Sequence, residues 1–310
     1  MFIAKCPLRI SLIGGSTDLQ PFLDKYVRGC VISFPSNRFA YISVHDNHRG
    51  KYYLNYSKNE EVDSIEEIHN DVARVVLEHF KVGPITVSFE SDILSTGTGL
   101  ASSSAYMIAM IKALSMYTGQ HLTEFEICKK ALELERMFNP RTGQQDTYGC
   151  GIGGFKRIDF HLRNDPSFRF LSAKFLEEFD MALYHTGISR SSTKILKTFD
   201  TEKSFPLLQK VEELESHIVN KNVKGFLNVF NQGWEIKKKL SPLIVGNPEF
   251  QQWDEAFKRT PEILGVKLCG AGAGGYFLAL CKKGHVPKEV NGSAAIAIQV
   301  NEAGVTGQHF

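Results

Sequence analysis

The segment from Ser102 to Tyr117 places the strongest constraint on the fold, because it is predicted to be a helix with apolar residues on every face. These residues are Ala105, Met107, Ile108, Met110, Ile111 and Leu114. A surface helix carries a single apolar stripe, so a helix that is apolar all round belongs inside a fold. Other elements must therefore surround it. The 310 residues are enough for a substantial core and for two domains that share one cleft.

The other predicted elements mix strands with helices along the chain. Strands are predicted at residues 8–13, 31–34, 38–44, 52–56, 84–90, near 266, at 276–281 and at 294–300, with a hairpin formed by 157–160 and 168–171. Further helices are predicted at residues 64–80, 123–137, 205–220, 223–240 and 250–258. This mixture predicts an α+β class, or α/β if the sheet is parallel. The domain boundary is expected after the hairpin, which divides the chain into residues 1–172 and 173–310.

The distribution of charge and cysteine excludes several classes of protein. The net charge is +2 and the basic residues are scattered, so no binding of nucleic acid or membrane is expected. The densest basic run, at 237–239, is interpreted as a solvated helix end. The six cysteines lie far apart and no signal peptide is recognisable, which favours reduced thiols in a cytoplasmic protein. A metal site built on His or Cys is not expected, whereas Mg²⁺ held by oxygen ligands remains open.

A loop rich in glycine and serine, from Ser95 to Ala105, precedes the apolar helix. Glycine lets the backbone approach an anion closely, and the free N–H groups and dipole of a helix start favour phosphate. The alternative is a serine-capped helix after an ordinary turn. The chain has no G-x-x-x-x-G-K-[ST] motif and no early G-x-G-x-x-G, which argues against a P-loop enzyme and a Rossmann domain.

A second glycine loop follows Lys267 and leads into the strand at 276–281. Four of the six residues from Gly270 to Gly275 are glycine, and a simple turn needs only one or two. This density indicates close packing of the backbone against a ligand or another loop, with a strained hairpin or bulge as the alternative.

These two loops, together with the segment from Pro7 to Asp18, resemble the three ordered motifs of the GHMP kinases, which include galactokinase, homoserine kinase, mevalonate kinase and phosphomevalonate kinase. The resemblance runs from residue 2 to about residue 281. Within the superfamily the chain is most similar to the D-glycero-D-manno-heptose 7-phosphate kinase group. Gly14-Gly15-Ser16-Thr17-Asp18-Leu19 matches the first motif of that group, and the Gly-Glu-His-Thr-Asp-Tyr motif of galactokinases is absent. Segments 143–155, 185–191 and 233–240 resemble the same group.

The resemblance implies a GHMP kinase fold, in which an N-terminal domain like the second domain of ribosomal protein S5 is joined to a C-terminal ferredoxin-like domain. It also implies transfer of the γ-phosphoryl group of ATP, with Mg²⁺, to the anomeric hydroxyl group of D-glycero-D-manno-heptose 7-phosphate. The product would be the 1,7-bisphosphate used to make activated heptose for surface polysaccharide. The alternatives are a kinase for galactose or fucose, and a catalytically silent sugar or nucleotide sensor on the same fold.

The resemblance also assigns roles to individual residues. Asp146 matches the catalytic base, and Arg9 matches a basic residue that would keep this carboxylate ionised. Glu135, with Ser103, would hold Mg²⁺ through oxygen ligands. The ATP phosphates would bind at Gly97, Thr98, Gly99, Leu100, Ala101, Ser102, Ser103 and Ser104. The acceptor would contact Gly14, Gly15, Thr17, Asp18, Arg190, Gly272 and Ala273, with Arg190 as the partner of a substrate phosphate.

Each of these residues also has a structural interpretation. Asp146 could form an Asx-turn, Arg9 and Arg190 could lie at the surface, and Glu135 could lie on a solvated helix face. Two positions depart from the family pattern, because alanine replaces a frequent glycine at 101 and at 273. If either position requires a positive φ, the methyl group costs roughly 1 kcal/mol or more.

Overall fold

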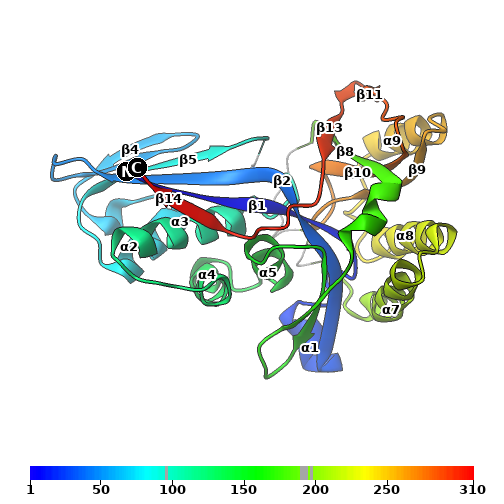
Figure 1. Cartoon of the computed structure of the whole chain (residues 1–310), viewed down its shortest axis with the longest axis horizontal. Helices are drawn as coiled ribbons and strands as arrows, with labels where there is room; N and C mark the ends of the chain where they lie inside the picture. Colours follow the sequence, from blue (N-terminus) through cyan, green and yellow to red (C-terminus); the bar gives the residue numbers. More distant parts are fainter. Residues whose placement is uncertain (95–96, 189–194, 196–197) are drawn as a thin grey trace.

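The computed structural model describes residues 1–94, 97–188, 195 and 198–310 (Figure 1). Its strands pair in antiparallel fashion except for β3 with β5, and helices are interspersed between them, which confirms the α+β class. No helix in these ranges is long and apolar enough to cross a membrane.

The helices are α1 (Gln20–Tyr26), α2 (Asp71–Phe80), α3 (Ser102–Tyr117), α4 (Glu124–Phe138), α5 (Gln145–Gly151), α7 (Pro206–Val219), α8 (Val223–Lys238) and α9 (Glu249–Lys258), with short 3-10 turns at Ile65–Glu67, Ala173–Glu178 and Glu202–Ser204. The strands are β1 (Phe2–Ile13), β2 (Arg28–Asp46), β3 (Tyr52–Asn55), β4 (Asn59–Val62), β5 (Ile85–Ser91), β6 (Lys156–His161), β7 (Ser167–Phe170), β8 (Phe179–His185), β9 (Ile263–Leu268), β10 (Tyr276–Lys282), β11 (Glu289–Val290), β12 (Ser293–Ala294), β13 (Ile296–Ile298) and β14 (Thr306–His309).

The larger sheet has eight strands in the order β14-β1-β2-β5-β3-β4, with β6 paired to β2 and β7 paired to β6. Its central strand β2 is continuous over 19 residues, so the prediction of two separate strands at 31–34 and 38–44 is wrong. β2 pairs with β6 through Arg28–Ser33 and with β5 through Ala40–Asp46. Pro35 lies between these two pairings, where its missing N–H group interrupts neither ladder.

Helix α3 lies under the larger sheet and begins and ends as predicted (Figure 1). It packs against β1 and β2 and also against α2, α4 and α5. Because these neighbours bury most of its residues, it can be apolar around its circumference. Helix α4 has the predicted capping box, in which Thr123 and Glu126 cap one another.

Helix α2 begins later than predicted. The segment expected as one helix from residue 64 to 80 consists of the 3-10 turn Ile65–Glu67 and the helix Asp71–Phe80. Asn70 is the N-cap, since its side chain accepts a hydrogen bond from the Ala73 N–H at 3.0 Å.

The smaller sheet has the order β13-β8-β10-β9 and is accompanied by α7, α8 and α9 (Figure 1). Its core is aromatic: Phe277 of β10 packs against Phe250, Trp253 and Phe257 of α9, and against Trp234 of α8. Such side chains bury large apolar areas, which fixes α8 and α9 to the sheet.

The C-terminal residues return to the larger sheet. Strand β14, which the sequence did not predict, pairs antiparallel with β1, and Met1 and Phe310 exchange hydrogen bonds at 2.9 Å. The two chain ends therefore lie together (Figure 1). The division into domains at residue 172 stays a prediction.

Charged side chains join the larger sheet to the smaller sheet and its helices. On β6, Arg157 pairs with Asp159 of the same strand and with Glu215 of α7, each at 2.6 Å, and Glu215 also accepts from Arg169 of β7 at 2.6 Å. Lys267 of β9 is buried and donates to the carbonyl oxygens of Ser11 and Leu12 at the end of β1.

Candidate active site

A cavity of about 950 Å³ opens where the helices of the larger sheet meet the loops of the smaller one. It is lined by residues 11–16, most of residues 97–104, residues 138–143 with Asp146, and residues 270–271. The volume is within the range of sites for small molecules and cofactors. The cavity brings together most of the residues that the sequence singled out.

One wall is the start of α3. Gly97 and Gly99 have φ values of 68° and 78°, and Ala101, the N-cap, has φ 63°. The first N–H groups of an α-helix have no partner within the helix, and the helix dipole adds a positive potential. This wall therefore offers N–H donors and the hydroxyl groups of Ser102 and Ser103 to an anion. Leu100 is fully buried and does not line the cavity.

The two alanines that replace family glycines both have a positive φ, with 63° at Ala101 and 60° at Ala273. Both positions therefore have the positive φ at which an added methyl group was expected to be unfavourable. Each methyl group therefore costs roughly 1 kcal/mol in backbone conformation.

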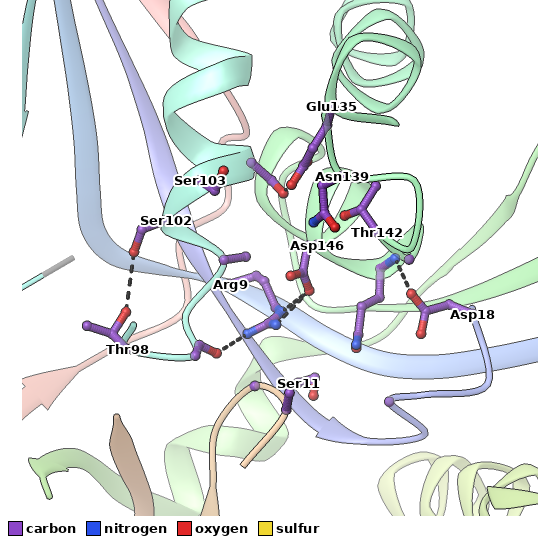
Figure 2. A pocket seen from close by; sticks show the side chains of 18 of the residues that line it. Arg9, Ser11, Asp18, Thr98, Ser102, Ser103, Glu135, Asn139, Thr142 and Asp146 are labelled. Atoms are coloured by element: carbon purple, nitrogen blue, oxygen red, sulfur yellow. Dashed lines mark hydrogen bonds and ion pairs between the residues drawn. The ribbon is translucent and has the colours of Figure 1, made fainter. Parts of the chain in front are cut away.

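Arg9 and Asp146 form the polar centre of the cavity (Figure 2). The Arg9 side chain is 3% exposed, and its Nε and Nη2 donate to Asp146 Oδ1 at 3.0 and 2.6 Å, while Nη1 donates to the Gly99 carbonyl at 2.6 Å. Burial alone would lower the pKa of Arg9, but the Asp146 carboxylate raises it. Arg9 thus ties the carboxylate to the loop before α3. Both bonds from Arg9 go to Oδ1, so Asp146 Oδ2 is left without a bond to this arginine.

Glu135, near the end of α4, is a buried carboxylate beside Asp146 and is 3% exposed. Burial raises its pKa to about 7, and the charge of Asp146 contributes, against the lowering by hydrogen bonds from Ser104 and Thr142. The resemblance paired Glu135 with Ser103. In the structure the hydroxyl group of Ser104 donates to Glu135 at 2.7 Å, whereas Ser103 is exposed to the cavity. Among the described residues, no cation pairs with Glu135.

The turn after β1 separates two neighbours that the sequence treated alike. Thr17 is fully buried and does not line the cavity. Its hydroxyl group donates to the carbonyl oxygens of Gly14 and Cys30 and accepts from the Cys30 N–H, so it fixes the turn. Asp18 does line it, and its Oδ2 accepts from the Gln145 N–H at 2.9 Å. Gly143 makes room for this contact, because a Cβ atom there would lie 2.0 Å from Asp18 Oδ2.

The second glycine loop packs against the first. A Cβ atom on Gly275 would lie 2.2 Å from the Thr98 carbonyl oxygen, and the N–H of Tyr276 donates to that oxygen at 3.2 Å. Close backbone packing, inferred from the density of glycine, is therefore present. Gly270 and Ala271 line the cavity, but Gly272 and Ala273 do not. Arg190 lies outside the described residues.

Sequence reasoning missed other residues of the site. Lys237 was interpreted as part of a solvated helix end, but its ammonium group donates to the carbonyl oxygens of Leu268 and Gly270 and lines the cavity. Lys267 also lines it, and burial lowers the pKa of this lysine to about 8. Gln145 and Arg141 line the cavity as well. Gln145 and Lys237 lie in segments that resemble the heptose kinase group, and Lys267 directly precedes the second glycine loop, but no role was assigned to these three residues from the sequence.

Comparison with known proteins gives a consistent result. Residues 67–154 match the family of the GHMP kinases N terminal domain. The chain is 27% identical over 87% of its length to a D-glycero-alpha-D-manno-heptose 7-phosphate kinase of Campylobacter jejuni, and the match covers 86% of that protein. It is 26% identical over 92% of its length to a galactokinase of Thermotoga neapolitana, of which 90% is covered.

Among solved structures, a D-glycero-D-manno-heptose 1-phosphate kinase from Bacteroides thetaiotaomicron superposes with a TM-score of 0.77 at 20% identity. The superposition covers 100% of this chain and 99% of the other. The fold is therefore the GHMP kinase fold that the sequence predicted. The family match lies on α2 to α5, which carry the helix start, Glu135 and Asp146. Residues 67–154 thus form a GHMP kinase N-terminal domain, the chain is similar over most of its length to sugar kinases, and the protein is a phosphotransferase that acts on a hydroxyl group.

Proposed function

We propose that this protein transfers the γ-phosphoryl group of ATP to the anomeric (C1) hydroxyl group of D-glycero-D-manno-heptose 7-phosphate. The product would be the 1,7-bisphosphate, for synthesis of activated heptose for surface polysaccharide. The observation that carries the proposal is the Arg9–Asp146 pair, which shares one cavity with the exposed start of α3. A base and an anion site next to each other are what phosphoryl transfer to a hydroxyl group requires.

The proposed chemistry assigns one task to each group. Asp146 Oδ2 takes the proton of the acceptor hydroxyl as the acceptor oxygen bonds to the γ-phosphorus and the bond to the β–γ bridging oxygen breaks, releasing ADP. Arg9 orients the carboxylate, because it holds Oδ1 by two hydrogen bonds. The N–H groups at the start of α3 bind phosphate oxygens.

A divalent cation fits beside Glu135. This buried carboxylate has a raised pKa and no cationic partner in the described part of the chain, so a bound cation would stabilise its ionised form. The hydroxyl of Ser103 lines the same cavity. We assign Glu135 and Ser103 as the residues that would hold Mg²⁺, which supplies positive charge to the phosphate oxygens when it is bound.

The choice of acceptor is supported by two observations. The relative from Campylobacter jejuni acts on a heptose 7-phosphate by its name, and the match spans 87% of this chain. The first motif, Gly14 to Leu19, is that of the heptose kinase group. Galactose is the second candidate acceptor, because a galactokinase matches at 26% identity over 92% of the chain.

The test is ATP consumption with Mg²⁺ against D-glycero-D-manno-heptose 7-phosphate, sedoheptulose 7-phosphate, galactose, fucose and mevalonate. We expect turnover with the heptose phosphate, and a loss of roughly 10²- to 10⁴-fold in kcat for Asp146→Asn. Asp165→Asn is the matched control, since Asp165 is an exposed partner of Lys129 outside the cavity. Turnover with galactose or fucose alone would contradict the proposal that the heptose phosphate is the substrate. ATP binding without turnover of any acceptor would support the sensor alternative.

A further inference from the structure

Two acceptor oxygens on residues that line the cavity have no hydrogen-bond donor among the described residues: Asp18 Oδ1 and Gln145 Oε1. Both atoms are buried, and both residues line the cavity. A buried polar atom without a partner costs free energy, so such atoms are rare in folded proteins. Two of them in one cavity, on residues joined by the Asp18 Oδ2 to Gln145 N–H bond, indicate a site shaped for a ligand with hydrogen-bond donors.

Both side chains are held firmly in place. Asp18 is 1% exposed and is fixed by the Gln145 N–H and by its close approach to Gly143. The Gln145 amide lies over the Gly15 turn, because a Cβ atom on Gly15 would be 3.2 Å from Gln145 Oε1 and 3.4 Å from Nε2. The pair is therefore preorganised by two glycines whose lack of a side chain leaves room for it.

The chemistry of this pair restricts what can bind there. Burial raises the pKa of Asp18 to about 6, and nearby Asp146 adds to the effect, so the ionised carboxylate needs donors. A phosphate or carboxylate group would be repelled by Asp18 and Asp146. Hydroxyl groups supply donors without charge, and a sugar presents them on adjacent carbons.

We infer that Gln145 is a specificity-determining residue which, together with Asp18, binds hydroxyl groups of the acceptor, among them the one next to the hydroxyl group that is phosphorylated. The inference rests on the proposed function, since it requires that Asp146 is the base. Gln145 directly precedes Asp146 in α5, so a hydroxyl group bound by the glutamine amide fixes the neighbouring hydroxyl group against the carboxylate. An acceptor that lacks the neighbouring hydroxyl group leaves the amide unpaired.

The experiment combines variants with acceptors that lack one hydroxyl group. kcat/KM is measured for wild type, Gln145→Met and Gln145→Ala with the heptose phosphate and its 2-deoxy analogue, and with galactose and 2-deoxygalactose. We expect Gln145→Met to lose roughly 10- to 100-fold with the complete acceptor. With the 2-deoxy analogue we expect wild type and both variants to be equal within about twofold, because the hydrogen bond is already missing.

The controls separate recognition from a general structural effect. The KM for ATP should not change in Gln145→Met, and Gln144→Met should behave as wild type, since Gln144 does not line the cavity. Equal losses with complete and deoxy acceptors, or no loss with the complete acceptor, would overturn the inference. If galactose is the acceptor, the heptose phosphate is not the substrate, but the comparison of galactose with 2-deoxygalactose still tests the role of Gln145. If no sugar is turned over, both proposals fail.

Discussion

The buried ion pairs between β6 and α7 allow a quantitative prediction of stability. Glu215 is 7% exposed and accepts from Arg157 and from Arg169, whose side chains are 10% and 63% exposed. In Glu215→Ala, Arg157 loses a charge-assisted hydrogen bond inside the protein but keeps Asp159. Removal of one partner from a fully buried pair costs about 3–5 kcal/mol. Because Asp159 remains, we expect the lower end, about 3 kcal/mol in the free energy of unfolding.

The matched variant is Arg169→Ala, which removes the solvent-exposed partner of the same carboxylate. An exposed ion pair contributes only about 0–1 kcal/mol, so we expect a loss of that size. Both variants and their double are measured by urea unfolding. If Arg169 acts only through Glu215, the double variant loses no more than Glu215→Ala. A cost below about 1 kcal/mol for Glu215→Ala, or equal costs for the two single variants, would refute the reasoning.

Other predictions concern the cavity and the elements that support it. Asp18 is ionised above about pH 6, and protonation turns one of its acceptor oxygens into a donor, so wild-type kcat/KM should fall as the pH drops through 6. In Asp18→Asn this fall of kcat/KM at acid pH should be absent. An unchanged fall would contradict the role of Asp18 in binding the acceptor. Gly284 has a positive φ with nothing near its Cβ position, so Gly284→Ala should cost about 1 kcal/mol in urea unfolding. Gly275→Ala should cost roughly 1–3 kcal/mol more than Gly284→Ala and raise the KM for ATP, because its methyl group would meet the Thr98 carbonyl oxygen. Equal costs for the two variants would show that this contact does not affect stability. Lys156 is fully buried and donates to carbonyl groups that follow α5, so Lys156→Met should lose about 1–3 kcal/mol by thermal or urea unfolding, and no loss would show that these bonds contribute nothing.

The sequence alone determined the features that depend on local pattern. Helix α3 has the predicted bounds because an apolar residue on every face permits only a buried helix. The capping box of α4 was predicted, because Thr123 and Glu126 are close in sequence. The glycine loops marked close backbone approach, and the ordered motifs indicated the family. Arg9 and Asp146 were named together only through that resemblance, since 137 residues separate them.

Tertiary structure decided the features that depend on distant partners. β2 is continuous because β5 and β6 pair with its two halves, and β14 is a strand because β1 lies beside it. Burial and hydrogen bonding separated Thr17 from Asp18, which local pattern could not distinguish. Lys237 lines the cavity only because the loop at Gly270 lies within reach of its ammonium group. In each case the deciding contact joins segments far apart in the chain, and no local window of sequence contains both.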